Sequence, residues 1–220
     1  ELCLSLGTHQ FDVTRAPGSL PTGFELYNHA TAMAKIKQIQ GYMAYWNQYK
    51  KPSAGWDALS CIFSTSGTDN IWTSRVALKP LSTDDLDDDY KTYYLYGFLP
   101  KENVNGGVSI APYNSSYANG AVMTFTGLNT VVGNDLCVFV GVQGYTGSVP
   151  DMSLRLGKFN YNPTDGNLIY LLVDRFYAGL KFSMTLDDKY AKLRDIKVKR
   201  VKLIPKVIET VDAKVTIAAN

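Results

Sequence analysis

The chain has 220 residues, a length typical of one large all-β domain or of one domain with part of another. Lys and Arg total 22 and Asp and Glu total 20, and this nearly balanced charge argues against a dedicated nucleic-acid binder. No apolar run is long enough to predict a transmembrane segment, and no basic region followed by an apolar one indicates a signal peptide. Because the sequence starts at Glu1, a secretory origin stays open.

The N-terminal part of the chain combines short strands with a connector. Residues 2–6 alternate apolar and other side chains, which predicts a short strand with one apolar face, and residues 11–15 form a second piece. Two prolines and two glycines deny regular structure to residues 16–23. Asn28 to Ile39 is the best helix candidate, with Asn28 as its N-cap.

From residue 39 onward the sequence predicts strands separated by turn residues. The predicted strands are residues 39–46, 58–64, 71–78, 91–98, 108–110, 121–126, 136–142 and 154–159. Val138 to Val140 is continuously apolar, which predicts a central strand that is buried on both sides. The number and spacing of these strands favour an all-β sandwich.

The most regular alternation covers residues 176–186, where six apolar side chains occupy every second position. We predict a central strand there, with Phe182 in the core. The next alternating run changes phase between Val198 and Val201, which indicates a β-bulge or a bend. The apolar positions of residues 207–217 predict one more strand, or the first strand of a further domain.

The residues that usually carry chemistry form no recognisable constellation. The three cysteines, Cys3, Cys61 and Cys137, lie in apolar runs and are interpreted as buried free thiols, although one disulfide of unassigned pairing stays open. The two histidines have no nucleophile or metal-ligand partner in the sequence, and the acidic run 84–89 lacks the order of a calcium loop. We therefore expect no catalytic residue, no metal and no cofactor.

Aromatic residues gather in two places, and each group allows two interpretations. The first group is Tyr42, Tyr45, Trp46, Tyr49 and Trp56. Exposed together, these side chains would form a platform for a glycan; packed inward, they would be part of the core. In the second group, Tyr94, Tyr96 and Phe98 alternate, which indicates one face of a strand.

The order of several short motifs resembles the fimbrillins, the pilin and pilus-tip proteins of Bacteroides-type bacteria. The matching stretches are VTRA at 13–16, QGYMAYW at 40–46, YYLYGFLP at 93–100, NDLCV at 134–138 and FYAGLKFSM at 176–184. Many fimbrillins have His before the last of these, whereas this chain has Asp174 and Arg175. Each motif is weak alone, and their shared order carries the resemblance.

The resemblance implies an extracellular, transthyretin-like Greek-key β-sandwich with one short helix, formed by residues 1–206. Residues 207–220 would then be a terminal strand or the start of a second domain. The implied function is that of a shaft, tip or anchor subunit of a cell-surface fimbria, associated with the outer membrane and assembled with other subunits by strand exchange. A host protein or glycan would be a further partner, and no nucleic acid, cofactor or catalysis is implied.

The resemblance also implies a processing site, because assembly in this family is thought to follow removal of the first strand by a protease that cuts after Arg. Here Arg15 and Ala16 precede the Pro- and Gly-rich connector, where an exposed backbone would admit a protease. The removable strand would carry Leu2, Leu4 and Leu6. Two alternatives stay open: residues 1–15 are a fixed part of the sandwich, or the chain is a glycan-binding module that uses its clustered Tyr and Trp residues.

Overall fold

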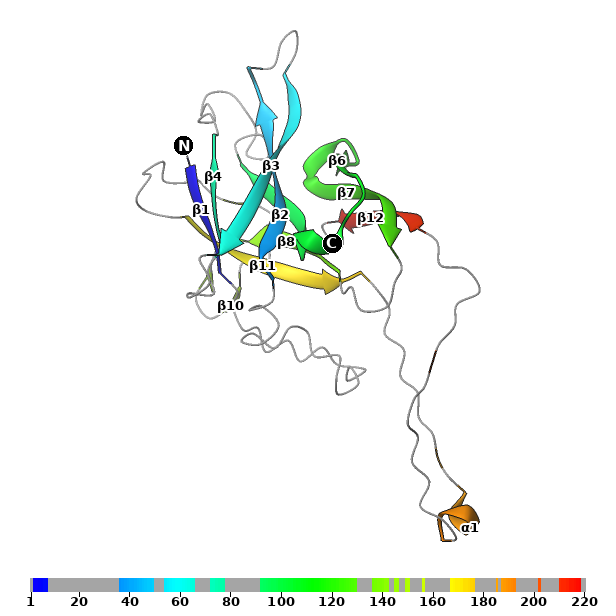
Figure 1. Cartoon of the computed structure of the whole chain (residues 1–220). Coiled ribbons are helices and arrows are strands. Elements are labelled where there is room, and N and C mark those ends of the chain that lie inside the picture. The colour runs from blue at the N-terminus through cyan, green and yellow to red at the C-terminus, as the bar shows by residue number, and fades with distance from the viewer. Residues whose placement is uncertain are drawn as a thin grey trace.

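The computed structural model describes residues 2–7, 36–49, 54–65, 72–77, 92–129, 136–142, 145–146, 149–150, 156, 167–176, 185, 187–192, 202 and 210–218. In this part of the chain almost every element is a β-strand, and most strand pairs are antiparallel (Figure 1). Two curled sheets lie against each other through a shared apolar layer. The prediction of an all-β sandwich is therefore confirmed.

The larger sheet closes on itself. Its strands are β1 (Leu2–Gly7), β2 (Gln38–Asn47), β3 (Gly55–Thr65), β4 (Trp72–Val76), β5 (Tyr94–Leu99), β8 (Cys137–Val142) and β11 (Asn167–Arg175). They pair in the order β1-β11-β8-β5-β2-β3-β4, and β1 also pairs with β4, so that the described strands form a closed barrel. The closure of this sheet was not predicted from the sequence.

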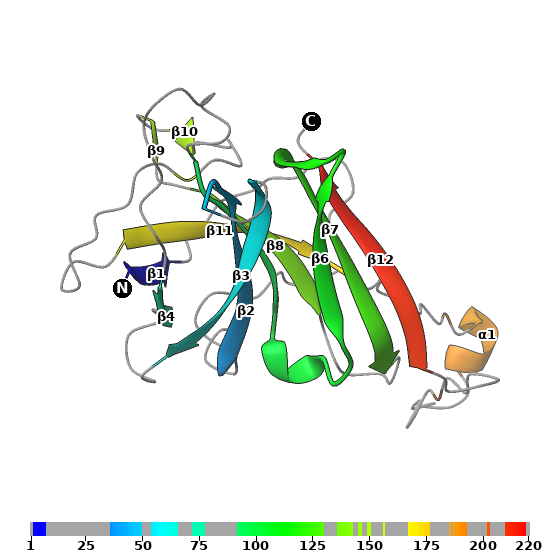
Figure 2. The same ribbon diagram turned by 90° about the horizontal axis from the view of Figure 1, so that it is seen from above.

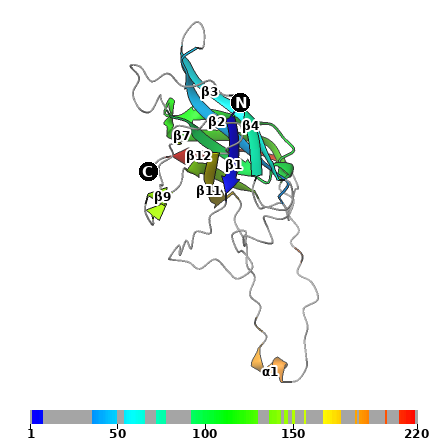
Figure 3. The same cartoon turned by 90° about the vertical axis from the view of Figure 1, so that its left-hand side faces the viewer.

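A three-stranded sheet forms the second layer. It consists of β6 (Val108–Tyr113), β7 (Ser116–Asn129) and β12 (Thr210–Ala218), in the order β12-β7-β6 (Figure 2). Two short strands, β9 (Tyr145–Thr146) and β10 (Val149–Pro150), pair separately. The described helices are η3 (Lys101–Asn103) and α1 (Asp188–Ala191), and α1 lies away from both sheets (Figures 1 and 3).

The interior of the barrel is filled by side chains. Buried residues from every barrel strand meet there, among them Leu4, Ile39, Phe63, Trp72, Leu95, Phe139 and Ile169. Glycine is required where backbones approach closely: a Cβ added to Gly97 would lie 2.1 Å from the carbonyl oxygen of Gln40 and 2.5 Å from the ring of Phe139. The inward faces of the strands therefore form an apolar core of the kind that stabilises small barrels.

A second apolar layer lies between the barrel and the three-stranded sheet. Tyr94, Tyr96 and Phe98 of β5 point to this layer, where Phe98 contacts Phe125 of β7 with 5.3 Å between ring centroids. Both faces of β5 and β8 are consequently covered, and all of their residues are buried. This confirms two predictions: the central strand around Val138–Val140 and the shared face of the second aromatic group.

The predicted helix over residues 28–39 is wrong in its described part. Ile36 and Lys37 have no regular structure, and Gln38 and Ile39 already belong to β2; residues 28–35 lie outside the described residues. Ile39 begins the inward alternation that continues with Met43, and it pairs with Phe63 of β3. Because this pairing buries a β-branched side chain inside the barrel, the strand prevails over the modest helix propensity of the segment.

The strand predicted over residues 176–186 lies almost entirely outside the described residues and stays a prediction. The strand β11 precedes it and ends at Arg175. Phe176 lies in a bend, and its ring packs on that of Phe125 with 5.4 Å between ring centroids. Residues 177–184, which include Phe182, lie outside the described residues, as do residues 11–15 and almost all of 196–203. Of residues 154–159 only Leu156 is described, and it forms a bridge with Tyr93.

The strand predicted within residues 207–217 is confirmed as β12. It pairs with β7 along nearly its whole length, from Thr210 opposite Asn129 to Ala218 opposite Gly120. Its inward side chains, Ala213, Val215 and Ile217, pack on the apolar layer between the two sheets. Residues 210–218 thus form an integral strand of the three-stranded sheet.

Candidate functional site

The N-terminal strand β1 closes the barrel. It runs antiparallel to β4, with Leu2 opposite Val76 and Leu6 opposite Trp72, and parallel to β11, with Leu4 opposite Asn167 and Gly7 opposite Tyr170. Figure 3 shows β1 between β4 and β11 at the side of the barrel that faces the viewer. Without β1, the described strands of the larger sheet would form an open sheet with β4 and β11 at its two edges.

The apolar face of β1 is part of the barrel core. Leu4 and Leu6 are 0% exposed and belong to the same cluster as Trp72 and Ile169. Burial of a leucine side chain contributes roughly 1.5–3 kcal/mol before the entropy of ordering is subtracted. Loss of β1 would therefore expose two apolar pockets and the unpaired backbone groups of two strands, a state that another strand can repair.

The predicted processing site, Arg15 and Ala16, lies outside the described residues. The described residues on either side of this site are Gly7, where β1 ends, and Ile36, which is buried. Leu2 lies on β1 with Leu4 and Leu6, although only the last two side chains are described. The three residues of the predicted removable strand therefore lie together on β1. Their position relative to Arg15 and Ala16 lies outside the described residues.

The five residues of the predicted glycan platform do not form one exposed surface. Tyr45 packs against the barrel core, whereas Tyr42 and Trp56 pack against the layer between the sheets. Trp46 is partly buried and lies directly opposite Trp56, with 5.4 Å between their ring centroids. Only Tyr49 of the five is largely exposed, at 55%. Most of the group is thus engaged in packing between strands.

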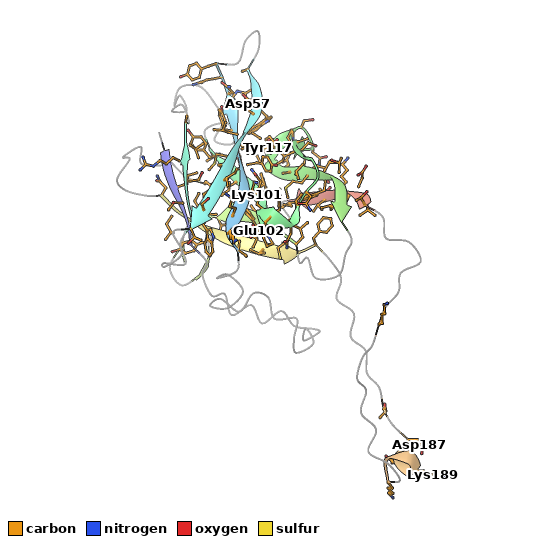
Figure 4. All side chains as sticks on the ribbon, viewed as in Figure 1. Asp57, Lys101, Glu102, Tyr117, Asp187 and Lys189 are labelled. Carbon is orange, nitrogen blue, oxygen red and sulfur yellow. The ribbon has the colours of Figure 1, made fainter. Side chains whose placement is uncertain are left out.

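Trp56 connects this group to the buried tyrosines. The centroid of its ring lies 6.0 Å from that of Tyr94 and 5.7 Å from that of Tyr117. The hydroxyl of Tyr96 donates a hydrogen bond to the carbonyl oxygen of Tyr117 at 2.6 Å. Burial, and after it the charge of the Asp57 carboxylate, raises the pKa of Tyr117 to about 12. Figure 4 shows Asp57 and Tyr117 close together near the start of β3. These hydroxyls are therefore neutral structural groups at ordinary pH.

Metal-ligating side chains are not gathered into a site in the described part of the chain. It contains no group of three or more His, Cys, Asp or Glu side chains placed to hold a metal ion. Both histidines and the acidic run 84–89 lie outside it. Cys61 is a buried free thiol, as predicted, and burial raises its pKa to about 12, which disfavours the reactive thiolate. Cys137 is fully buried.

Two features of this site were not predicted from the sequence: the strand β11, and the pairing of β1 with β4 and β11. The apolar run from Leu168 to Val173 was a signal for β11, because continuous apolar runs of this length are typical of buried strands. The predicted strand 71–78 corresponds to β4, but its pairing with β1 had no local signal. No described helix is both long and apolar enough to cross a membrane.

Comparisons of the chain with protein-family profiles, with curated proteins and with solved structures give no match. The position of β1 between β4 and β11 and the motifs in the sequence are therefore the observations that bear on function.

Proposed function

We propose that this chain is a structural subunit of a bacterial cell-surface fimbria, in which β1 occupies a groove that a strand of a neighbouring subunit fills during assembly. The observation that carries the proposal is the position of β1 at the closure of the barrel, between β4 and β11. The order of motifs that resembles the fimbrillins supports the same assignment. In this role the protein is extracellular, associated with the outer membrane and without catalytic activity.

The groove defines what a donor strand must look like. The donor runs parallel to β11 and antiparallel to β4, and it makes ladder hydrogen bonds with both. It needs apolar side chains two residues apart to fill the spaces of Leu4 and Leu6. Backbone pairing then provides affinity, and the two pockets provide specificity. Other subunits are the proposed partners in assembly, and a host protein or glycan is the proposed partner in adhesion.

Limited digestion with an Arg-specific protease, followed by size-exclusion chromatography and electron microscopy, tests this proposal. We expect a first cut between Arg15 and Ala16, and we expect the nicked protein to associate into oligomers or filaments once β1 leaves. A synthetic peptide of residues 1–15 in excess should suppress this association, because it occupies the groove. The same peptide with Leu4 and Leu6 changed to Ser should not, because it cannot fill the apolar pockets.

Arg15→Gln is the matched control, since it removes the cleavage site and leaves the sequences of β1 and of the other barrel strands unchanged. This variant should stay intact at that bond and should not associate under the same conditions. A protein nicked after Arg15 that remains monomeric would contradict the proposal. Association that the native peptide and the Ser-substituted peptide affect equally would also contradict it.

A further inference from the structure

The outer edge of β12 is unpaired among the described strands. β12 lies at one end of the three-stranded sheet, and β7 is its only described neighbour in that sheet (Figure 2). The opposite end of the sheet is β6, which contains Pro112. Because proline has no N–H to donate, β6 is a poor template for another strand, whereas β12 contains no proline along its nine residues.

β12 keeps a regular alternation along this edge. The register shift near Asp212 arises on β7, since Thr126 and Gly127 both lie opposite the single residue Asp212. Gly127 takes the positive φ of 68° at this bulge, and its N–H donates to Asp212 Oδ1 at 2.8 Å. The bulge therefore leaves the outward edge of β12 without an interruption.

The sequence of β12 is complementary to itself when read in the opposite direction. From the first residue the strand reads Thr210, Val211, Asp212, Ala213, Lys214, Val215 and Thr216. An antiparallel copy centred on Ala213 places Thr opposite Thr, Val opposite Val, and Asp212 opposite Lys214 at two symmetric positions. Residues directly opposite in an antiparallel pair point to the same face, so the two oppositely charged pairs meet across the seam.

The exposure of these side chains fits such a pairing. Asp212 and Lys214 are exposed on the outer face of the sheet, where a pair across the seam is accessible to them. Val211 is 41% exposed, and it would lie beside Val215 of the second copy. Ala213 at the centre is small enough for the two strands to approach without steric conflict.

The charges of Asp212 and Lys214 also disfavour the registers that are shifted by two residues from the one centred on Ala213. If one copy shifts by two residues in either direction, Asp212 meets Asp212 or Lys214 meets Lys214, and like charges directly opposite are destabilising. A lysine on an edge strand ordinarily discourages pairing with any other strand. Here Asp212 of one copy lies opposite Lys214 of the other and compensates its charge, but only in the register centred on Ala213.

We propose that β12 is a two-fold interface, at which two copies of this chain pair antiparallel through Ala213 and join their three-stranded sheets into one continuous sheet. Such an interface is isologous, because each copy presents the same surface to the other. It lies on a different strand from the groove of β1. It therefore provides lateral association between subunits that is independent of strand exchange, and it does not depend on the proposed fimbrial function.

Sedimentation equilibrium of the intact chain, from micromolar to millimolar concentration, tests this interface. We expect a monomer–dimer equilibrium. Lys214→Glu should weaken dimerisation at least about tenfold, because two attractive pairs become repulsive. Asp212→Lys should have the same effect, and an equimolar mixture of the two variants should recover dimers, because every pair across the mixed seam is again of opposite charge. Lys189→Glu makes the same charge change on the distant α1 and should dimerise like the unmodified protein.

Asp212→Lys also removes the acceptor for the N–H of Gly127, so a second measurement is needed if this variant does not fold. Added salt should then weaken the dimer of the unmodified protein and strengthen that of Lys214→Glu, because screening reduces attraction in the first and repulsion in the second. A chain that is monomeric at every concentration would overturn the proposal. So would a dimer that Lys214→Glu leaves unchanged, which would indicate a different interface.

Discussion

At the scale of single residues, the buried tyrosines show how the two sheets are held in register. Tyr96 extends from the barrel strand β5, and its hydroxyl reaches the backbone of Tyr117 on β7 at 2.6 Å. A buried hydrogen bond of this kind contributes roughly 0.5–1.5 kcal/mol, but loss of one partner leaves a desolvated group that costs more. The bond thus favours one relative placement of the two layers over others that would bury the same apolar area.

The raised pKa of Tyr117 predicts a loss of stability in alkaline solution. Burial first, and then the Asp57 carboxylate, raise its pKa from 10.0 in the unfolded chain to about 12 in the folded protein. The unfolded chain therefore loses the phenolic proton at lower pH, so the stabilisation is complete below pH 10 and is lost as the pH rises toward 12. Urea unfolding at a series of pH values should show the free energy of unfolding falling through this range.

Tyr117→Phe should reduce the steepness of this fall, because it retains the ring contact with Trp56 and removes the titrating hydroxyl. Tyr49→Phe is the matched control at an exposed position, and it should keep the profile of the unmodified protein. If both variants keep the original pH dependence, Tyr117 does not carry the effect.

At the scale of elements, β1 has a larger role than its length indicates. A six-residue strand supplies both the final pairing of the barrel and two buried leucines. Leu6→Ala should lower the free energy of unfolding by about 2–5 kcal/mol, because it leaves a cavity beside Trp72 and other core residues that cannot fully relax. Denaturant titration followed by tryptophan fluorescence measures this difference.

Leu168→Ala on the adjacent strand β11 is the matched control. Leu168 lies opposite Ser5 of β1 but is 44% exposed, so the same substitution should change the free energy of unfolding by no more than about 0.5 kcal/mol. Equal losses in the two variants would mean that β1 does not contribute to the core as described.

The elements also show which features the sequence could predict. The alternation of apolar side chains was enough to predict β1 and β12, and a continuous apolar run was enough to predict β8. These patterns can be read from the residues of a single strand. The parallel pairing of β1 with β11 joins residues far apart in the chain and leaves no local pattern. The aromatic group on β2 was ambiguous for a related reason: this strand packs on both faces, so neither alternate row is marked as exposed.

At the scale of the whole molecule, the barrel and the three-stranded sheet share their central strands. β5 sends Leu95 and Leu99 into the barrel and Tyr94, Tyr96 and Phe98 into the layer between the sheets. β8 divides its side chains in the same way, with Phe139 in the barrel and Val138 and Val140 in the layer. Loss of either the barrel core or the layer between the sheets would therefore expose one face of β5 and β8, which also contribute side chains to the other core.

This shared construction predicts that the two layers unfold as one cooperative unit, as small single domains usually do. The chain contains three tryptophans, and two of them report on different cores: Trp72 is buried inside the barrel, and Trp56 packs on the layer between the sheets. In a variant with Trp46 and Trp56 changed to Phe, fluorescence follows the barrel. In one with Trp46 and Trp72 changed to Phe, it follows the layer. Within each variant, the fluorescence midpoint in denaturant should coincide with the midpoint from far-ultraviolet circular dichroism. A fluorescence transition of Trp56 that precedes the loss of strand structure would mean that the three-stranded sheet separates from an intact barrel.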